Sequence, residues 1–277
     1  MIQCHDNFRG MSTDLRKGYA ETRFGQIHYR AAGNGVGLPL VLLHQTASDS
    51  VMYEPLMWAL AGVTRTIALD TPGFGGSFAL DGLPTVELWS EALIDALDAL
   101  GVGACNLFGH HTGASIAAQI AVDRPDRVRA LALSGPPYLS AEERARFLAT
   151  AVYRIAPSPD GAHLGAIWAR IFAKEPGVPL ALGEREALLT LRAGPRYAPA
   201  YEAVFSHDFA SLLPRIACPT LLMAGEHDSL RAYVAPACRA MSNAQMRIIP
   251  DAGTYVCERQ TEALAALLRE FFTLTGI

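Results

Sequence analysis

The chain has 277 residues, of which 51% are hydrophobic and 18% are charged, and its formal net charge at pH 7 is −4. This length predicts one or two domains with a sizeable core, and the composition excludes a disordered, collagen-like or small disulfide-stabilised protein. Because acidic residues outnumber basic ones, the sequence offers no basic surface for a phosphate backbone. We therefore do not expect a nucleic acid as a partner.

The cysteines predict a reducing compartment. There are five of them, an odd number without C-x-x-C spacing, which argues against a disulfide framework and a zinc ribbon. Residues 1–18 read as a polar arm, in which Met11 is an alternative start, and they lack the apolar region of a signal peptide. No run of about 18 apolar residues follows, so we expect a cytoplasmic protein with no membrane partner. The sequence leaves open whether it forms a homo-oligomer.

From residue 19, short apolar runs alternate with amphipathic segments, which predicts an α/β fold with a mostly parallel, doubly wound sheet. Several runs are continuously apolar, as in strands buried on both faces. The expected strands are 22–30, 39–43, 66–69, 104–108, 130–133, 220–224 and 246–249. The expected helices are 85–100, one that begins near 112 and one that begins near 258.

The alternation stops between residues 135 and 215. This interval carries helical stretches at 141–153 and 166–173, separated by several prolines. We interpret it as a helical lid inserted between two parts of one core domain, 19–134 and 216–277. Within this lid, the aromatic residues at spacing four, 197, 201 and 205, are expected to form lid core rather than contact a ligand.

The strand predicted at 104–108 runs into Gly109-His110-His111-Thr112-Gly113 and then into a helix of small residues. Small residues two before and two after a central residue allow a sharp strand-to-helix turn, which lifts the central side chain above the sheet. That central residue is His111. Open parallel sheets place their sites at the carboxyl ends of the strands, so we expect His111 to lie in the site.

The turn and three further segments resemble the α/β-hydrolase superfamily, specifically its lidded branch of lactonases, carbon–carbon bond hydrolases, haloperoxidases and epoxide hydrolases. The resemblance covers about residues 20 to 275, and its segments come in the family's order. The further segments are Val41-Leu42-Leu43-His44-Gln45-Thr46, Leu69-Asp70-Thr71-Pro72-Gly73-Phe74-Gly75-Gly76-Ser77, and Cys218-Pro219-Thr220 through Gly225-Glu226-His227-Asp228. The resemblance implies a catalytic acid at Asp228 and an oxyanion hole formed by the backbone N–H groups of Thr46 and Thr112.

Two positions depart from the family pattern. The turn normally carries Ser, occasionally Asp or Cys, where this chain has His111, and the catalytic His after the last strand is replaced by Thr254 and Tyr255. A serine nucleophile needs an adjacent base, so ordinary serine acyl transfer is not available to this chain. The reference pKa of an imidazole is about 6.5, so an imidazole can act as a base at pH 7 without help. We therefore expect His111 to be a general base that Asp228 orients.

The remaining candidates line the expected site. They comprise two histidines expected to have structural roles, a side-chain amide that orients substrate or water, and two residues that fill the space of the missing His: His44, His110, Gln45, Thr254 and Tyr255. The phenol of Tyr255 is also a candidate proton donor.

We expect neither a metal nor a cofactor. The neighbouring histidines lack the spacing of metal ligands, and no glycine-rich nucleotide motif is complete. The expected partner is a small-molecule substrate.

Three functions remain open at this point. The first is hydrolysis of a small, apolar carbonyl compound: an ester, a lactone or a diketone. The second is a cofactor-free lyase, decarboxylase, isomerase or oxygenase, for which proton abstraction needs no covalent step. The third is a non-catalytic protein that binds a ligand on the same fold. The identity of the substrate depends on lid side chains whose positions the sequence does not give.

Overall fold

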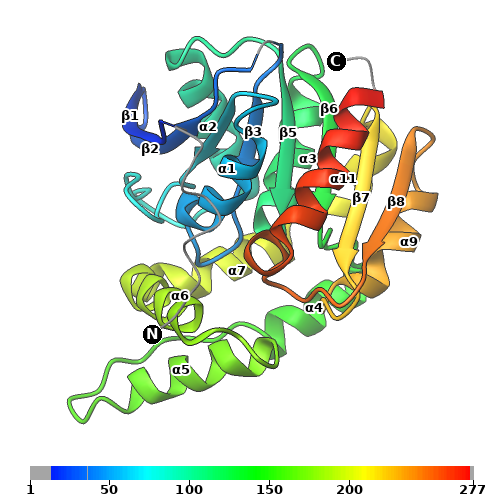
Figure 1. The fold of residues 1–277 in the computed structure, drawn as a ribbon. Coiled ribbons are helices and arrows are strands. Elements are labelled where there is room, and N and C mark those ends of the chain that lie inside the picture. The colour runs from blue at the N-terminus through cyan, green and yellow to red at the C-terminus, as the bar shows by residue number, and fades with distance from the viewer. Residues whose placement is uncertain (1–13, 36, 275–277) are drawn as a thin grey trace.

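The computed structural model describes residues 14–35 and 37–274, which form an eight-stranded sheet with helices on both faces (Figure 1). The strand order is β1-β2-β4-β3-β5-β6-β7-β8. The pairs β1–β2 and β2–β4 are antiparallel, and every other neighbouring pair is parallel. The mostly parallel sheet predicted from the sequence is thus confirmed. No helix within the described ranges is long and apolar enough to span a membrane.

The strands follow the apolar runs closely, apart from the first. They are β1 Arg16–Thr22, β2 Gly25–Ala32, β3 Leu40–Leu43, β4 Thr66–Leu69, β5 Cys105–His110, β6 Val128–Ser134, β7 Thr220–Gly225 and β8 Ala244–Ile249. The strand expected at 22–30 is confirmed over residues 25–30, which belong to β2, but its start is wrong, because the chain reverses at 22–25 and Thr22 pairs with Gly25. The polar arm expected at 1–18 is wrong for residues 16–18, which pair with β2. Residues 1–13 lie outside the described residues.

The helices of the core flank the sheet. They are α1 Glu54–Leu60, α2 Val86–Ala99, α3 Thr112–Asp123, α9 Arg231–Arg239, α10 Val256–Arg259 and α11 Thr261–Leu274. Helix α2 begins where the sequence predicts, because the Thr85 hydroxyl accepts a hydrogen bond from the amide of Leu88 at 3.1 Å. Helices α1 and α9 were not predicted from the sequence.

Two apolar layers hold the helices to the sheet. On β3, Val41 and Leu43 belong to the layer beneath α2 and α3, whereas Leu40 and Leu42 belong to the layer beneath α1 and α11. Figure 1 shows α11 crossing one face of the sheet while α3 lies behind it. Because successive side chains of a strand point to opposite faces, continuous apolar runs are what such a two-sided core requires.

A helical segment separates β6 from β7. It contains α4 Ala141–Thr150, α5 Ala162–Lys174, α6 Leu180–Ala193, α7 Tyr197–Ser206 and α8 Phe209–Leu212. We call residues 135–215 the helical segment. In Figure 1, α5, α6 and α7 lie beyond the ends of the parallel strands, on the side to which the strand arrows point. The expected helix at 166–173 is the second part of α5, and α6 falls where no helix was predicted.

Candidate active site

A sharp turn joins β5 to α3 at His111. The backbone of His111 adopts φ 50° and ψ −107°, a conformation that few non-glycine residues adopt. Gly109 and Gly113 make this turn sterically feasible. A Cβ on Gly109 would lie 2.1 Å from the carbonyl oxygen of Gly113, and a Cβ on Gly113 would lie 1.9 Å from the carbonyl oxygen of Leu43. The small residues of the sequence pattern therefore serve the close contact of strand and helix.

The imidazole of His111 contacts the carboxylate of Asp228. Its Nε2 lies 2.8 Å from Asp228 Oδ2, although the two residues are 117 positions apart. Asp228 follows β7, and only β6 separates β7 from β5 in the sheet. Gly135, just after β6, leaves room for the ring, because a Cβ there would lie 2.3 Å from His111 Cδ2.

The charge of Asp228 determines which nitrogen of His111 carries a proton. Burial alone would raise the pKa of Asp228, but the charge and hydrogen bond of His111, with a 2.7 Å hydrogen bond from the Leu230 amide, lower it to about 2. An ionised carboxylate only accepts hydrogen bonds, so Nε2–H of His111 donates to it. In the neutral ring Nδ1 then carries the lone pair. Within residues 14–35 and 37–274, Nδ1 has no hydrogen-bond partner.

His111 opens onto a cavity of about 240 Å³ between the sheet and the helical segment. The His111 side chain is 17% exposed, whereas that of Asp228 is fully buried behind it. The cavity is lined by Gln45, His111, Thr112, Pro137, Phe147, Ala151, Arg170, Lys174, Tyr197, Tyr201, Val204, Phe205, Ser229, Leu230 and Thr254. This volume is below the roughly 300–1,000 Å³ of pockets for drug-sized ligands, so the cavity suits a small molecule.

The two expected oxyanion donors differ in their surroundings. Thr112 lines the cavity and is the first residue of α3, so its amide has no partner within the helix. Thr46 does not line the cavity, and its N–H donates to Thr112 Oγ1 at 3.3 Å. The Thr112 hydroxyl in turn donates to Thr46 Oγ1 at 2.9 Å. The expectation of two free amides is therefore not met, because a neighbouring hydroxyl occupies one of them.

His44 and His110 brace the site without lining it. The Nδ1–H of His44 donates to the Gln45 carbonyl at 2.9 Å, and its Nε2 accepts from the Thr71 amide at 2.9 Å. His110 is completely buried, which lowers its pKa to about 3, so the ring is neutral. Its Nε2–H donates to the Thr254 carbonyl at 2.9 Å. Both nitrogens of each ring are therefore engaged within the protein, and neither ring faces the cavity.

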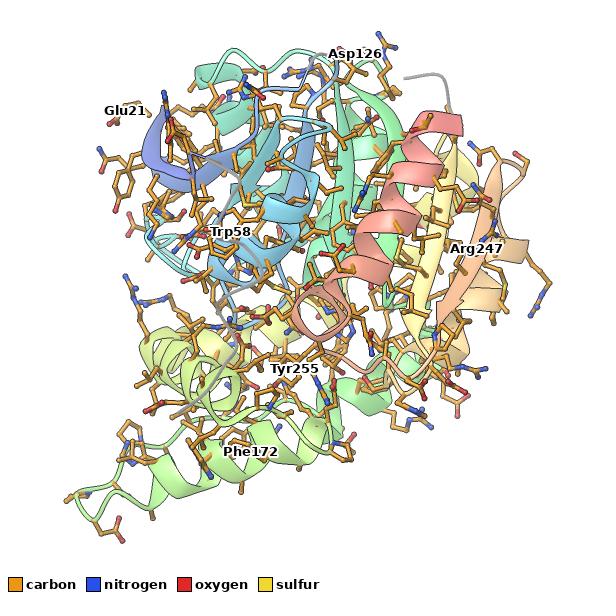
Figure 2. All side chains as sticks on the ribbon, in the orientation of Figure 1. Glu21, Trp58, Asp126, Phe172, Arg247 and Tyr255 are labelled. Carbon is orange, nitrogen blue, oxygen red and sulfur yellow. The ribbon has the colours of Figure 1, made fainter. Side chains whose placement is uncertain are left out.

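Thr254 and Tyr255 are placed differently from each other. Thr254 lines the cavity, but Tyr255 does not and is completely buried. Its amide donates to Glu175 Oε2 at 3.0 Å, while its hydroxyl has no hydrogen-bond partner in the described part of the chain. Figure 2 shows Tyr255 between α11 and the helical segment. Its phenol therefore lies behind the wall of the cavity, which corrects the expectation that Tyr255 lines the site.

Several lining residues were not expected from the sequence to contact a ligand. Tyr197 and Phe205 are buried in the apolar core as expected, and Tyr201 packs against it, but all three also line the cavity. The Tyr201 hydroxyl donates to the Thr46 carbonyl at 3.2 Å. The spacing of four residues between these aromatic residues on α7 was the available signal. Arg170 and Lys174 of α5 also line the cavity, and nothing in the sequence pattern distinguished them from other exposed cations.

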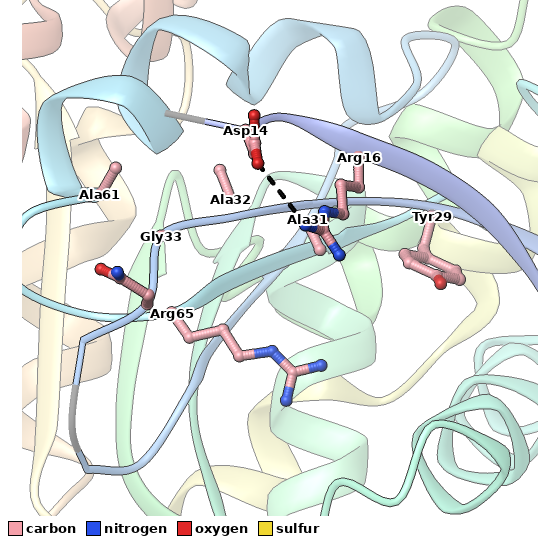
Figure 3. A pocket seen from close by; sticks show the side chains of 9 residues that line it. Asp14, Arg16, Tyr29, Ala31, Ala32, Gly33, Ala61 and Arg65 are labelled. Carbon is pink, nitrogen blue, oxygen red and sulfur yellow. Dashed lines mark hydrogen bonds and ion pairs between the residues drawn. The ribbon is translucent and has the colours of Figure 1, made fainter. Parts of the chain in front are cut away.

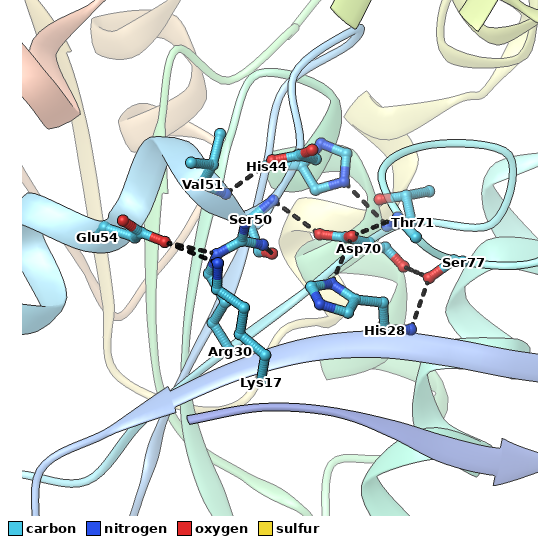
Figure 4. Close-up of polar contacts among 12 residues, drawn as sticks. Lys17, His28, Arg30, His44, Ser50, Val51, Glu54, Asp70, Thr71 and Ser77 are labelled. Carbon is cyan, nitrogen blue, oxygen red and sulfur yellow. Dashed lines mark hydrogen bonds and ion pairs between the residues drawn. The ribbon is translucent and has the colours of Figure 1, made fainter. Parts of the chain in front are cut away.

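A second His–Asp pair lies away from this cavity (Figure 4). Asp70 contacts His28 Nδ1 at 2.8 Å and accepts hydrogen bonds from the amides of Ser50 and Gly76, each at 2.8 Å. Burial would raise the pKa of Asp70, but these partners and the charge of His44 lower it to about 2. Because Asp70 is completely buried and both its oxygens are occupied, the pair holds the turn at 70–77.

A larger cavity, of about 550 Å³, lies by β2 and the start of β4 (Figure 3). Its lining includes Tyr29, Arg65 and the ion pair between Asp14 and Arg16. Arg65 precedes β4, so this cavity lies at the amino ends of the parallel strands. Sites in open α/β sheets form at the opposite ends, so the cavity at His111 is the stronger candidate.

Comparison with known proteins agrees with the fold. Residues 39–259 match a family model described as the alpha/beta hydrolase fold. The chain belongs to this family. It is 32% identical over 111 residues to the (E)-2-((N-methylformamido)methylene)succinate hydrolase of Acinetobacter baylyi, a match that covers 40% of this chain and 41% of that protein.

Two further relatives match over more of their length. The poly(3-hydroxyalkanoate) depolymerase of Ectopseudomonas oleovorans is 26% identical, over 84% of this chain and 83% of that protein. The structure of a thermophilic esterase from Thermogutta terrifontis superposes with a TM-score of 0.71 at 25% identity, over 94% of this chain and 99% of that chain.

The lowered pKa of Asp228 predicts a pH-dependent contribution to stability. The pKa of aspartate in the unfolded chain is about 3.9. This contribution is therefore fully present above about pH 4 and is lost as the pH falls towards about 2. Asp228→Asn should lower the free energy of unfolding by about 2 kcal/mol at pH 7, measured by urea unfolding. The difference from the wild type should shrink towards pH 2. A difference that stays constant across this range would contradict the assignment.

Proposed function

We propose that the protein is a hydrolase for a small, apolar carbonyl compound, an ester, a lactone or a diketone, with His111 as its general base. The contact between His111 Nε2 and Asp228 Oδ2 at 2.8 Å carries this proposal. It fixes the ring, assigns the proton to Nε2 and leaves a basic Nδ1 in a residue that lines the cavity. The hydrolase, depolymerase and esterase among the relatives support the same class of reaction.

The proposed reaction activates water directly. Nδ1 of His111 takes a proton from a water molecule as the oxygen attacks the carbonyl carbon, which gives a tetrahedral oxyanion and an imidazolium that the Asp228 carboxylate stabilises. Collapse of the oxyanion breaks the bond to the leaving group, and the leaving group takes the proton from Nδ1. An ester gives an acid and an alcohol, and a diketone gives an acid and a ketone. The neutral His111 ring is restored.

Two donors are proposed for the oxyanion. The first is the Thr112 amide at the start of α3, where the helix dipole also favours negative charge. The second is the side-chain amide of Gln45, which lines the cavity and has no hydrogen-bond partner among the described residues. The Thr46 amide becomes available only if the Thr112 hydroxyl turns away from it.

The helical segment is proposed to act as the lid of this site. Helices α5 and α7 supply much of the cavity lining, and buried polar contacts join the segment to the core. Ser48 donates to Glu186 Oε1 at 2.9 Å, and Arg185 pairs with Glu258. Such a cover limits the access of bulk water to the reacting carbonyl.

Removal of the imidazole should abolish this hydrolysis. His111→Ala is expected to lower kcat/KM by at least about 10²-fold for any ester, lactone or diketone that the wild type hydrolyses, because a general base contributes about 10²–10⁴-fold. The measurement is a screen of such compounds followed by steady-state kinetics. His163→Ala is a matched control, because His163 lies on α5 but does not line the cavity. Hydrolysis that survives in His111→Ala would place the base elsewhere.

A second candidate function is cofactor-free proton abstraction from carbon, as in a lyase, decarboxylase, isomerase or oxygenase. Two features of the site favour it. His111 has the carboxylate of Asp228 as its hydrogen-bond partner, and the turn offers no serine nucleophile for His111 to activate. In deuterated water, the wild type should then exchange the acidic C–H of a bound carbonyl compound, and His111→Ala should not; NMR measures both rates. Exchange without hydrolysis selects this function. Tight binding with neither reaction would indicate a non-catalytic binding protein.

A further inference from the structure

Two cations of α5 face the candidate cavity. Arg170 and Lys174 are four residues apart on this helix, so their side chains share one face of it, and both line the cavity that contains His111. No acidic residue is among the described residues that line this cavity. The carboxylate of Asp228 is buried behind the His111 ring and hydrogen-bonded to it.

Neither cation has an acidic partner among residues 14–35 and 37–274. Other arginines of the helical segment do: Arg144 pairs with Asp208, Arg154 with Glu202 and Arg185 with Glu258. Among the described residues, by contrast, Arg170 and Lys174 form no ion pair. The guanidinium of Arg170 lies over the ring of Tyr153, with its carbon 4.3 Å from the ring centroid. This stacking orients the guanidinium but does not neutralise its charge.

We propose that Arg170 and Lys174 bind a carboxylate group of the substrate. The proposal rests on the proposed hydrolysis in one respect, because it assumes that the same molecule presents its reacting carbonyl to His111. Arginine binds a carboxylate with two parallel hydrogen bonds, and lysine adds a compact positive charge beside it. The substrate class is then a small ester, lactone or diketone that also carries a carboxylate.

The rest of the cavity lining fits such a molecule. Tyr197, Tyr201 and Phe205 offer aromatic surface for a short apolar chain between the two polar ends. Burial raises the pKa of Tyr197 although Lys174 and Arg170 act to lower it, so the phenol stays protonated and can donate a hydrogen bond. Residues of the helical segment thus bind the substrate's carboxylate, and residues at the strand ends of the core bind its reacting carbonyl.

The test compares two esters that differ only in charge, mono(4-nitrophenyl) glutarate and its methyl ester. The wild type should prefer the charged ester. In Arg170→Gln/Lys174→Gln the ratio of the two kcat/KM values should fall about tenfold or more, because a charge-assisted hydrogen bond is lost. The preference of the wild type should also weaken as salt rises. Arg239→Gln, which removes an exposed arginine of α9 outside the cavity, should keep the wild-type ratio.

Calorimetric titration with glutarate separates the carboxylate site from the proposed hydrolysis. Glutarate should bind to the wild type and at least about tenfold more weakly to the double variant. If glutarate binds in this way but neither ester is hydrolysed, the proposed hydrolysis fails and the carboxylate site stands. If glutarate binds both proteins equally or not at all, or if inorganic phosphate displaces it at equal concentration, the carboxylate site is overturned. In that case, hydrolysis that depends on His111 would still stand.

Discussion

The candidate site depends on one hydrogen bond, between His111 Nε2 and Asp228 Oδ2. The sheet makes this bond feasible, because β5, β6 and β7 lie side by side in parallel and their carboxyl ends meet at one edge. Glycines at 109, 113 and 135 provide the space, since a Cβ at these positions would collide with the turn, with β3 and with the His111 ring, respectively. Fold and site are therefore coupled through the backbone: the chain can hold the ring against Asp228 only while strand and helix pack this closely.

Two adjacent histidines show how surroundings assign different roles to one side chain. The ring centroids of His110 and His111 are 4.4 Å apart. His110 is completely buried, its pKa is lowered to about 3, and its two nitrogens contact Ser134 and the Thr254 carbonyl. His111 has an anionic partner on one nitrogen and no partner on the other within the described ranges. Only the second arrangement leaves a basic nitrogen for chemistry.

The sequence predicts the features that depend on local pattern. Buried strands are continuous apolar runs, α2 has its cap at Thr85, and the glycines around His111 indicate a sharp turn at a strand end. Features that depend on contacts between residues far apart in the sequence could not be predicted from it. The amide of Thr46 has an acceptor because Thr112, 66 residues away, presents its hydroxyl there. Tyr255 packs behind the cavity wall rather than in it, and Arg170 and Lys174 face the cavity because of how α5 packs against α6. No periodicity in the sequence encodes these long-range placements.

The central claim is that Nδ1 of His111 is unprotonated, while its Nε2–H donates a hydrogen bond to Asp228. Nitrogen-15 NMR of the protein with labelled histidine, recorded near neutral pH, tests it directly. The account predicts that His111 is the Nε2–H tautomer, with an unprotonated Nδ1, and that Asp228→Asn removes this preference because the neutral amide can also donate. A ring protonated on Nδ1 alone would contradict the account. So would a tautomer that is unchanged by Asp228→Asn, because Asp228 would then not be the group that assigns the proton.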